Sequence, residues 1–275
     1  MDATALESVR RRYAQEILRL AGAQDARIEE AFAQVAREKF VPGPPWTLVR
    51  AGAAWMSSNP ADLYEDVLVV IDRLRGINNG EPALHAAWLA AIDPQHGETA
   101  IHVGAGTGYY TAMLSRLVGP DGQVDAYEYE ADLAAIAATN LATYANTRVH
   151  AQSAYGRLLP ETDIIYVNAG VTAPDVHWLG AMKSGARLIF PWQPHGGWGP
   201  AILVRRKPAG FSANILMSVG FIPCSGAMPK ERHPAVPSTA DIQSLGSIWL
   251  RQVRTPDSTA IATYDEVWFS SEPVG

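Results

Sequence analysis

A short run from Ile101 to Tyr110 constrains the fold of this chain more than any other segment. Its letters, IHVGAGTGYY, indicate a buried strand, a glycine turn and the start of a helix. The turn places three glycines at alternate positions, Gly104, Gly106 and Gly108. Such a turn lets the backbone approach a ligand closely, and the start of the helix offers unpaired N–H groups. About 20 residues on, Glu128 ends the next predicted strand, where nucleotide-binding folds bind ribose hydroxyls with an acid.

Together these features predict a site for an adenosine-type cofactor. S-adenosyl-L-methionine suits such a site because it contains an adenosine but no pyrophosphate. The predicted contacts come from the turn and from the end of the second strand: Gly104, Ala105, Gly106, Thr107, Gly108, Tyr109, Glu128 and Tyr129. Two tyrosines open the helix, and we expect one of Tyr109 and Tyr110 to face the ligand and the other the core.

Composition narrows the class of protein. A chain of 275 residues with 48% apolar content can form one large α/β domain with appendages. Its net charge of −6 argues against binding nucleic acid through phosphate neutralisation. The single cysteine, Cys224, excludes an internal disulfide, and the scattered histidines predict no metal site. Since no apolar stretch approaches about 18 residues, we expect a soluble, cytoplasmic protein without a membrane partner.

The N-terminal third contains several predicted elements. Amphipathic helices are expected at 4–21 and 27–37, followed by a Pro/Gly/Trp-rich loop at 41–46. Residues 62–73 are interpreted as a further helix, or partly as a strand through 67–70. A turn is expected at 76–80 and a helix at 81–92, where Pro82 occupies the first helical turn.

From residue 98 onward, predicted strands alternate with predicted helices, as in a doubly wound parallel sheet. The strands are expected at 99–103, 123–129, 147–152, 163–167, 186–191, 200–206 and 213–222, and the helices at 109–118, 130–143 and 174–183. No helix separates the last two strands, so an antiparallel hairpin should end the sheet, as is typical of methyltransferases. The predicted class is therefore α/β, with a doubly wound, mostly parallel, seven-stranded Rossmann-like sheet. Three parts are expected: an N-terminal helical segment with a substrate loop (1–97), a cofactor-binding core (98–225) and an extension packed on that core (226–275).

The order of these segments resembles the protein-L-isoaspartate O-methyltransferase family over residues 25–230. The resemblance rests on RIEEAFAQVAREKFVP at 27–42, Leu63-Tyr64-Glu65-Asp66, HVGAGTGYYTAMLSRLVGPDGQV at 102–124, LGAMKSGARLIFP at 179–191, and Phe221-Ile222-Pro223. It implies a class I methyltransferase that uses S-adenosylmethionine.

The resembled family has a Thr-Ile-Ser-x-Pro loop, whose serine hydroxyl lies between the cofactor and the isoaspartyl carboxylate. The aligned residues here are Asn78-Asn79-Gly80-Glu81-Pro82, so Gly80 offers no hydroxyl and the amide of Asn79 stands one position early. His85 matches a histidine found beside the cofactor in some members, or is a partly buried histidine with structural partners. The resemblance implies catalytic positions at Asn79, Gly80 and His85, and substrate positions at Tyr64 and Ser225.

Further cofactor positions also depart from the family pattern. His102 stands where a glutamate usually fixes the amino-acid end of the cofactor, and Ser153-Ala154 stands where Asp-Gly usually holds the adenine amino group. Asn168 ends the fourth predicted strand, at the edge where open α/β sheets bind ligands. The alternatives to these cofactor roles are structural: His102 would be a core-facing histidine bonded to the backbone, and Asn168 would form a cap or turn.

The expected reaction is methyl transfer to a carboxylate, which is already ionised at neutral pH and needs no strong base. The acceptor is expected to be a peptide, protein or small-molecule carboxylate that has diverged from isoaspartyl peptides, because the loop serine is missing. One alternative is a non-catalytic adenosyl-ligand-binding or scaffold protein, which the departures at Gly80, His102 and Ser153 favour. Another is a nicotinamide-dependent oxidoreductase, which the GxGxG spacing and the final hairpin disfavour.

Overall fold

The computed structural model describes residues 3–225, 227 and 237–274. The chain divides into two compact units, the first formed by residues up to 98 with 105–151, and the second by 99–104 with those from 152 onward. The predicted extension at 226–275 lies partly outside the described residues, which do not include 226, 228–236 and 275. Within the described ranges, no helix has the length and apolar character needed to cross a membrane.

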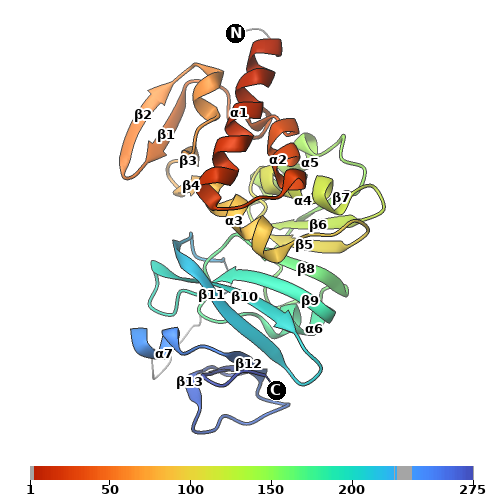
Figure 1. Cartoon of the computed structure of the whole chain (residues 1–275), viewed down its shortest axis with the longest axis vertical. Coiled ribbons are helices and arrows are strands. Elements are labelled where there is room, and N and C mark those ends of the chain that lie inside the picture. Colours follow the sequence, from red (N-terminus) through yellow and green to blue (C-terminus); the bar gives the residue numbers. More distant parts are fainter. Residues whose placement is uncertain (1–2, 226, 228–236, 275) are drawn as a thin grey trace. The chain divides into compact units, whose positions relative to one another are not determined.

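The first unit contains most of the helices. They are α1 (Ala3–Ala21), α2 (Ala26–Gln34), α3 (Pro82–Ile92), α4 (Tyr109–Val118) and α5 (Ala131–Asn140), with 3-10 turns η1 (Arg37–Phe40) and η2 (Pro60–Leu63). Helices α1 and α2 lie side by side (Figure 1), because apolar side chains at helical spacing, such as Tyr13 and Ile17 on α1 and Phe32 on α2, are buried. The predicted helix at 27–37 is too long, since Val35 is extended and the chain forms the separate turn η1 from Arg37.

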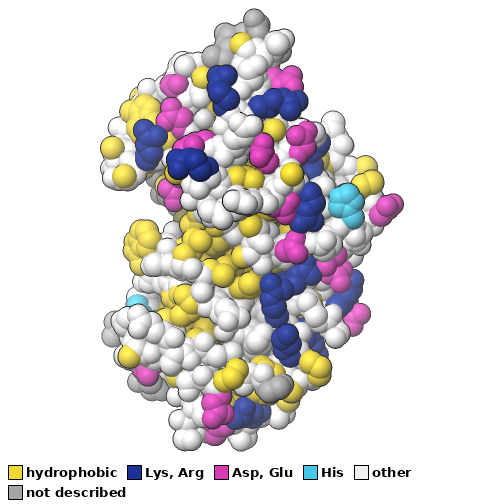
Figure 2. Space-filling view, in the orientation of Figure 1, with side chains coloured by type: hydrophobic (Ala, Val, Ile, Leu, Met, Phe, Trp, Pro, Cys, Tyr) yellow, Lys and Arg dark blue, Asp and Glu magenta, His cyan; other side chains and the backbone are white. Residues whose placement is uncertain are grey.

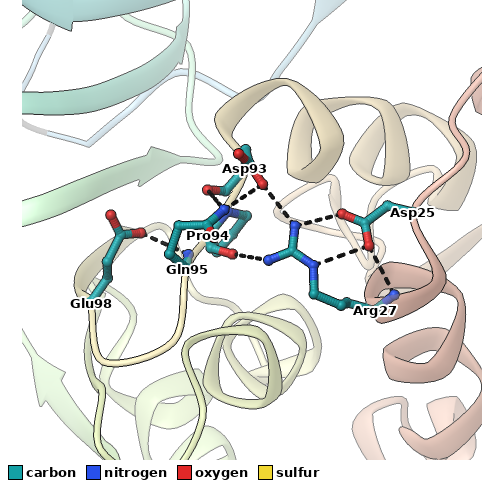
Figure 3. Close-up of polar contacts among 6 residues, drawn as sticks. All are labelled: Asp25, Arg27, Asp93, Pro94, Gln95 and Glu98. Carbon is teal, nitrogen blue, oxygen red and sulfur yellow. Dashed lines mark hydrogen bonds and ion pairs between the residues drawn. The ribbon is translucent and has the colours of Figure 1, made fainter.

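Arg27 ties the start of α2 to the end of α3 (Figure 3). Its Nη2 atom lies 2.7 Å from a carboxylate oxygen of Asp25 and 2.7 Å from one of Asp93. Its Nη1 atom donates to the carbonyl of Pro94 at 2.8 Å. Asp93 ends α3 in the left-handed conformation, with φ of 51°. The arginine thus fixes the end of the helix that carries His85.

A four-stranded antiparallel sheet precedes α3 in the first unit. Its order is β2-β1-β3-β4, formed by β1 (Trp46–Arg50), β2 (Ala53–Ser57), β3 (Leu68–Asp72) and β4 (Ile77–Asn78). The helix interpretation of 62–73 is therefore wrong and the strand interpretation is correct, because the β-branched run Val69-Val70-Ile71 favours a strand. Strands β1 and β2 were not predicted. Strand β4 leads directly into the loop that carries Asn79 and Gly80.

The first unit also contains the parallel pair β6 (Gln123–Glu128) and β7 (Thr147–Ala151), in which Val124 is opposite Thr147. Both strands begin where they were predicted to begin. Helix α5 ends at Asn140 rather than at 143. This pairing places Glu128 at the carboxyl end of β6, opposite Ala151.

Oppositely charged side chains lie close together on the surface of the first unit (Figure 2). On α1, Arg19 pairs with Glu16 at 2.6 Å. In the turn between β3 and β4, Arg75 lies 2.8 Å from Glu130 and 2.6 Å from Asp132. Arg75 therefore connects the β3–β4 turn to the segment that follows Glu128.

The second unit is built on one mixed sheet. Its strands are β5 (Thr99–Val103), β8 (Thr162–Val167), β9 (Met182–Pro191), β10 (Trp198–Arg206), β11 (Phe211–Gly220), β12 (Ser247–Leu250), β13 (Ala260–Thr263) and β14 (Val267–Ser270). They lie in the order β13-β14-β12-β11-β10-β9-β8-β5. Strands β5, β8 and β9 are parallel, and β10 and β11 form the predicted antiparallel hairpin. The α/β class with strands alternating with helices is confirmed.

Two differences from the prediction concern the second unit. Helix α6 spans only Val176–Ala181, because Met182 already pairs with Thr162 as the first residue of β9. The extension adds three strands and the short helix α7 (Thr239–Gln243), so the described residues of this unit alone hold eight strands in one sheet. Strand β12 pairs with β11, where Ile248 is opposite Phe211. The domain bounds at 97/98 and 225/226 stay a prediction.

Candidate functional site

The glycine turn adopts a backbone that glycine favours. Gly104, Gly106 and Gly108 have φ of 74°, 55° and 96°, in the left-handed region. Gly108 precedes α4 directly, and a Cβ on it would lie 3.0 Å from the side chain of Leu141. By contrast, nothing lies within 4 Å of the position that a Cβ on Gly106 would take. The turn therefore leaves open space beside Gly106, where a ligand can approach the backbone.

Glu128 is held against this turn by its two carboxylate oxygens. Oε2 accepts from the backbone N–H of Gly106 at 2.6 Å, and Oε1 accepts from the N–H of Glu130 at 2.9 Å. Burial raises the pKa of Glu128 above its ordinary value, and the two backbone N–H groups act in the opposite direction. Because each carboxylate oxygen can accept more than one hydrogen bond, both can still accept from adjacent hydroxyls. The next residue, Tyr129, is 57% exposed.

Two other residues of the turn are engaged inside the first unit. The Thr107 hydroxyl donates to the carbonyl of Phe40, and the Thr107 carbonyl accepts from the amide of Asn140 at 2.9 Å. Tyr109 and Tyr110 are both buried, with ring centroids 5.0 Å apart. Both rings pack within the unit, and the expectation that one of them faces the ligand stays a prediction. The cofactor roles of Thr107 and Tyr109 stay predictions.

The loop after β4 is held by its own amides and by the sheet. The Asn78 side-chain oxygen accepts from the N–H of Gly80 at 2.9 Å, which closes a tight turn. The N–H of Asn79 donates to the carbonyl of Val69 at 2.9 Å. The Asn79 side-chain oxygen accepts from Nε of Arg37 at 3.0 Å. The loop is thus fixed on both sides of Asn79.

Arg37 is the functional candidate that the sequence reasoning missed. Its guanidinium is fully buried, and it donates to the carbonyls of Leu63 at 2.8 Å and Val67 at 2.7 Å as well as to Asn79. Among the described residues it forms no ion pair and its hydrogen-bond acceptors are neutral oxygens, while the Asp66 carboxylate acts on its charge without direct contact. The only signal in the sequence was its place in the segment 27–42 that carries the family resemblance.

His85 packs directly behind Gly80. Its ring is buried and stacks on Tyr110, with centroids 3.6 Å apart and an interplanar angle of 21°. A Cβ on Gly80 would lie 2.5 Å from Nε2 of His85, and Gly80 has φ of 75°. Any side chain at position 80 therefore requires the His85 ring to move. The structure brings together Asn79, Gly80 and His85, the three residues predicted as catalytic.

Tyr64, predicted as a substrate residue, is buried in the same region. Its hydroxyl accepts from the N–H of Arg37 at 3.1 Å and donates to the carboxylate of Glu38. Burial, together with the neighbouring Glu38 carboxylate, holds the pKa of Tyr64 well above its ordinary value. The hydroxyl therefore stays protonated and has structural partners, and its substrate role stays a prediction.

In the second unit, His102 and Asn168 contact each other. Asn168 follows β8, and its Nδ2 atom lies 2.9 Å from Nε2 of His102 on β5. Complete burial lowers the pKa of His102 to about 3, so the ring is neutral at physiological pH. The Asn168 side-chain oxygen is buried and has no hydrogen-bond partner among the described residues. His102 thus faces the core, as its structural interpretation expected, but it contacts a side chain.

Three more predicted residues lie near one another in the second unit. The Ser153 hydroxyl donates to the carbonyl of Ser225 at 3.4 Å and accepts from the N–H of Tyr155 at 3.1 Å. The carbonyl of Ala154 accepts from Nε1 of Trp178 at 2.9 Å. The structure therefore brings a predicted adenine-binding residue, Ser153, next to a predicted substrate residue, Ser225. Their roles stay predictions.

Comparisons with known proteins agree on one family. The family model described as "Protein-L-isoaspartate(D-aspartate) O-methyltransferase (PCMT)" matches residues 14–228. The protein-L-isoaspartate O-methyltransferase of Thermotoga maritima is 28% identical over 220 residues, which cover 76% of this chain and 64% of that protein. Protein-L-isoaspartate O-methyltransferase 2 of an Anaeromyxobacter species is 29% identical over 222 residues, covering 79% and 83%.

The fold comparison points the same way. A solved protein-L-isoaspartate O-methyltransferase structure superposes with a TM-score of 0.67 at 26% identity, covering 79% of this chain and 66% of that chain. This chain therefore spans less than two thirds of the length of both the Thermotoga protein and the solved structure.

Proposed function

Because the chain belongs to the protein-L-isoaspartate(D-aspartate) O-methyltransferase family, we propose that it transfers a methyl group from S-adenosyl-L-methionine to a carboxylate oxygen. The proposed acceptor is a carboxylate on a peptide, a protein or a small molecule. One observation carries the proposal, namely the Glu128 carboxylate held 2.6 Å from the backbone nitrogen of Gly106. An acid in this position beside a glycine turn can accept from both hydroxyls of a ribose.

The residues of the first unit fit such a cofactor. Glu128 is already oriented by the N–H groups of Gly106 and Glu130, so little reorganisation is needed when a sugar diol binds. The open space beside Gly106 allows the ligand to approach the backbone. When bound, S-adenosylmethionine supplies a methyl group activated by its sulfonium. The sulfur is the leaving group, and it needs no acid to protonate it. We retain as further proposed cofactor positions Gly104, Ala105, Thr107, Gly108, Tyr109, Tyr129, His102, Ser153, Ala154 and Asn168.

The acceptor needs to be held and aligned, since its carboxylate is ionised at neutral pH. We assign this role to Asn79 and Gly80, with Tyr64 and Ser225 as further proposed substrate positions. The crowding between position 80 and Nε2 of His85 supports an acceptor site that differs from one built around a serine at position 80. We therefore propose that the acceptor has diverged from an isoaspartyl peptide.

The test combines a binding measurement with a transfer measurement. Isothermal titration calorimetry with S-adenosylhomocysteine measures cofactor binding, and methyl-labelled S-adenosylmethionine measures transfer to an isoaspartyl peptide and to a panel of other carboxylates. We expect binding, and transfer to at least one carboxylate that exceeds transfer to the isoaspartyl peptide. Absence of binding at millimolar ligand would contradict the cofactor assignment, and binding without transfer to any acceptor would leave a non-catalytic adenosyl-binding protein.

A further inference from the structure

The contact between Arg37 and Asn79 determines which way the Asn79 amide faces. A guanidinium has only donors, so the Asn79 atom that lies 3.0 Å from Nε of Arg37 must be the oxygen. The orientation of this amide therefore follows from chemistry, whereas an amide between ambiguous partners has to be assigned. With the oxygen facing Arg37, the NH2 group of Asn79 takes the other side of the amide.

That NH2 group donates to no acceptor within the part of the chain that the structure describes. Among the described residues, none accepts from Nδ2 of Asn79, although the residue retains only 7% of its surface exposed. Nδ2 is not among the fully buried side-chain atoms that lack a partner, so it keeps some access to solvent, and a ligand can reach it by the same route. The ligand it can bind has an acceptor oxygen.

Hydrogen bonds hold the backbone of the loop around Asn79 in place, so the loop cannot move to bring the Asn79 NH2 group to a protein acceptor. The carbonyl of Gly80 accepts from Nη2 of Arg37 at 3.3 Å and from the Tyr110 hydroxyl at 3.5 Å. The N–H of Gly80 is bound to Asn78, and the N–H of Asn79 is bound to Val69. Arg37 thus holds the loop at two points, the Asn79 side chain and the Gly80 carbonyl.

The charge of Arg37 adds a preference for an anion. Its guanidinium is fully buried and has no carboxylate partner among the described residues. The Asp66 carboxylate acts on this charge without forming an ion pair with it, so the guanidinium can still stabilise negative charge bound nearby, because the interior screens the interaction poorly. A carboxylate that accepts from Nδ2 of Asn79 would gain from this field.

We infer that Arg37 is a positioning residue, which orients Asn79 so that its NH2 group donates to the carboxylate of the methyl acceptor. The inference rests on the proposed function, since it assigns the acceptor contact of that reaction. It also makes Asn79 the residue of the loop that recognises the acceptor.

The deciding variant is Asn79→Asp, which keeps the size of the side chain and replaces the NH2 donor with an oxygen. The new carboxylate gains an ion pair with Arg37, so we expect the variant to unfold at the same or a higher urea concentration than the unchanged chain. Its acceptor KM should rise by about tenfold or more, as expected when a hydrogen bond to a charged group is lost. Its affinity for S-adenosylhomocysteine should stay within about twofold, since Asn79 is assigned to the acceptor.

Asn78→Asp is the matched control, because it adds the same charge one position away. Its side-chain oxygen still accepts from the N–H of Gly80. We expect its acceptor KM to change less than about threefold, because Asn78 is only half-buried and solvent screens much of a charge placed there. Arg37→Lys tests the arginine itself, since lysine keeps the charge but lacks the planar set of donors. It should raise the acceptor KM without changing the affinity for S-adenosylhomocysteine.

The measurements use labelled S-adenosylmethionine with a synthetic isoaspartyl peptide and with N-acetylaspartate as acceptors. A KM rise in Asn79→Asp that is absent from Asn78→Asp supports the inference. Equal KM values for the two variants and the unchanged chain would overturn the inference while leaving the proposed function intact. If the unchanged chain transfers methyl groups to neither acceptor, nor to any carboxylate of the panel used to test the proposed function, the proposed function and the inference both fail.

Discussion

The carboxylate of Glu128 and the backbone N–H of Gly106 are joined by a hydrogen bond of 2.6 Å. The contact links the end of β6 to the glycine turn, 22 positions earlier in the sequence. It holds the acid in place before any ligand arrives, and leaves lone pairs on both oxygens for a sugar diol. The proposed cofactor assignment depends on this preorganised carboxylate.

The first prediction concerns the pH dependence of cofactor binding. Burial raises the pKa of Glu128 above its ordinary value of 4.5, so this carboxylate takes up a proton at a higher pH than an exposed glutamate. The protonated form accepts hydrogen bonds poorly, and affinity for S-adenosylhomocysteine should fall as pH drops through the raised pKa. Calorimetry between about pH 4.5 and 7.5 measures this decline, within the range where Glu and His side chains titrate.

Glu130→Gln provides the control for this measurement. The Glu130 charge contributes to raising the pKa of Glu128, so removing it should move the decline slightly to lower pH. The backbone N–H of residue 130, which donates to Glu128, is unchanged by the substitution. An affinity that stays constant across the whole range would show that the Glu128 carboxylate does not bind the ligand.

The second prediction concerns acid stability and His102. Its pKa is about 3 in the folded chain, against 6.5 for an unperturbed histidine, because burial disfavours the charged ring. Between these values the unfolded chain binds a proton that the folded chain does not. The contribution of His102 therefore lowers the free energy of unfolding as pH falls below 6.5, by about 1.4 kcal/mol per pH unit for one proton.

Urea unfolding of His102→Gln at several pH values tests this assignment. The variant should lose less stability on acidification than the unchanged chain, while the same substitution at the exposed His96 should leave the slope unchanged. Equal slopes in the unchanged chain and His102→Gln would mean that the ring is not the neutral, buried group described.

The third prediction compares two glycines at opposite ends of β4. Gly80 and Gly76 have φ of 75° and 69°, but only Gly80 has a close neighbour where a Cβ would be, since nothing lies within 4 Å at Gly76. Gly76→Ala should therefore lower the free energy of unfolding by about 1 kcal/mol, from backbone strain alone. Gly80→Ala should lower the free energy of unfolding by about 1–3 kcal/mol more than Gly76→Ala does, because the new methyl group overpacks against His85.

A double variant identifies the source of that extra cost. His85→Ala removes the ring that a Cβ at position 80 would meet, so in the Gly80→Ala background it should cost less than it does alone. Chemical denaturation of the two single variants and the double variant gives the coupling. Additive effects, or equal costs at Gly76 and Gly80, would contradict the crowding at position 80.

Much of the proposed cofactor site could be predicted because its pattern is local. The glycine turn, the helix from Tyr109 and the strand ending at Glu128 all lie within about 30 residues, and each has its own composition signal. The alternation of strands and helices after residue 98 follows from the same kind of signal. The β1–β2 hairpin was missed because β2 is largely exposed and lacks the alternation of a half-buried strand.

The role of Arg37 could not be predicted for a different reason. Its partners are mainly backbone carbonyls, including those of Leu63, Val67 and Gly80, which lie 26 to 43 positions away. A carbonyl is present at every residue, so the sequence contains no mark of which one is used. Only the packed loop reveals that a buried arginine orients Asn79.

The fourth prediction concerns the ion pairs of α2 and α3. Arg27 bridges Asp25, Asp93 and the carbonyl of Pro94, which are contributed by two different elements. Arg27→Ala should lower the free energy of unfolding by about 1 kcal/mol, because a half-exposed network with several partners stabilises the fold more than an isolated surface ion pair does. Arg19→Ala, which breaks the exposed pair with Glu16 on α1, should produce no measurable change. A larger loss in Arg19→Ala than in Arg27→Ala would contradict this account.

The most direct test of the proposed function is the affinity of S-adenosylhomocysteine for the unchanged chain and for Glu128→Ala, measured by calorimetry near neutral pH. Glu7→Ala, which removes an exposed acid on α1, controls for net charge, and thermal unfolding reports whether each variant is folded. Loss of two hydrogen bonds to a charged acceptor should weaken binding by about a hundredfold in Glu128→Ala and leave Glu7→Ala unchanged. Equal affinity of a folded Glu128→Ala and the unchanged chain would contradict the assignment of this carboxylate to the cofactor.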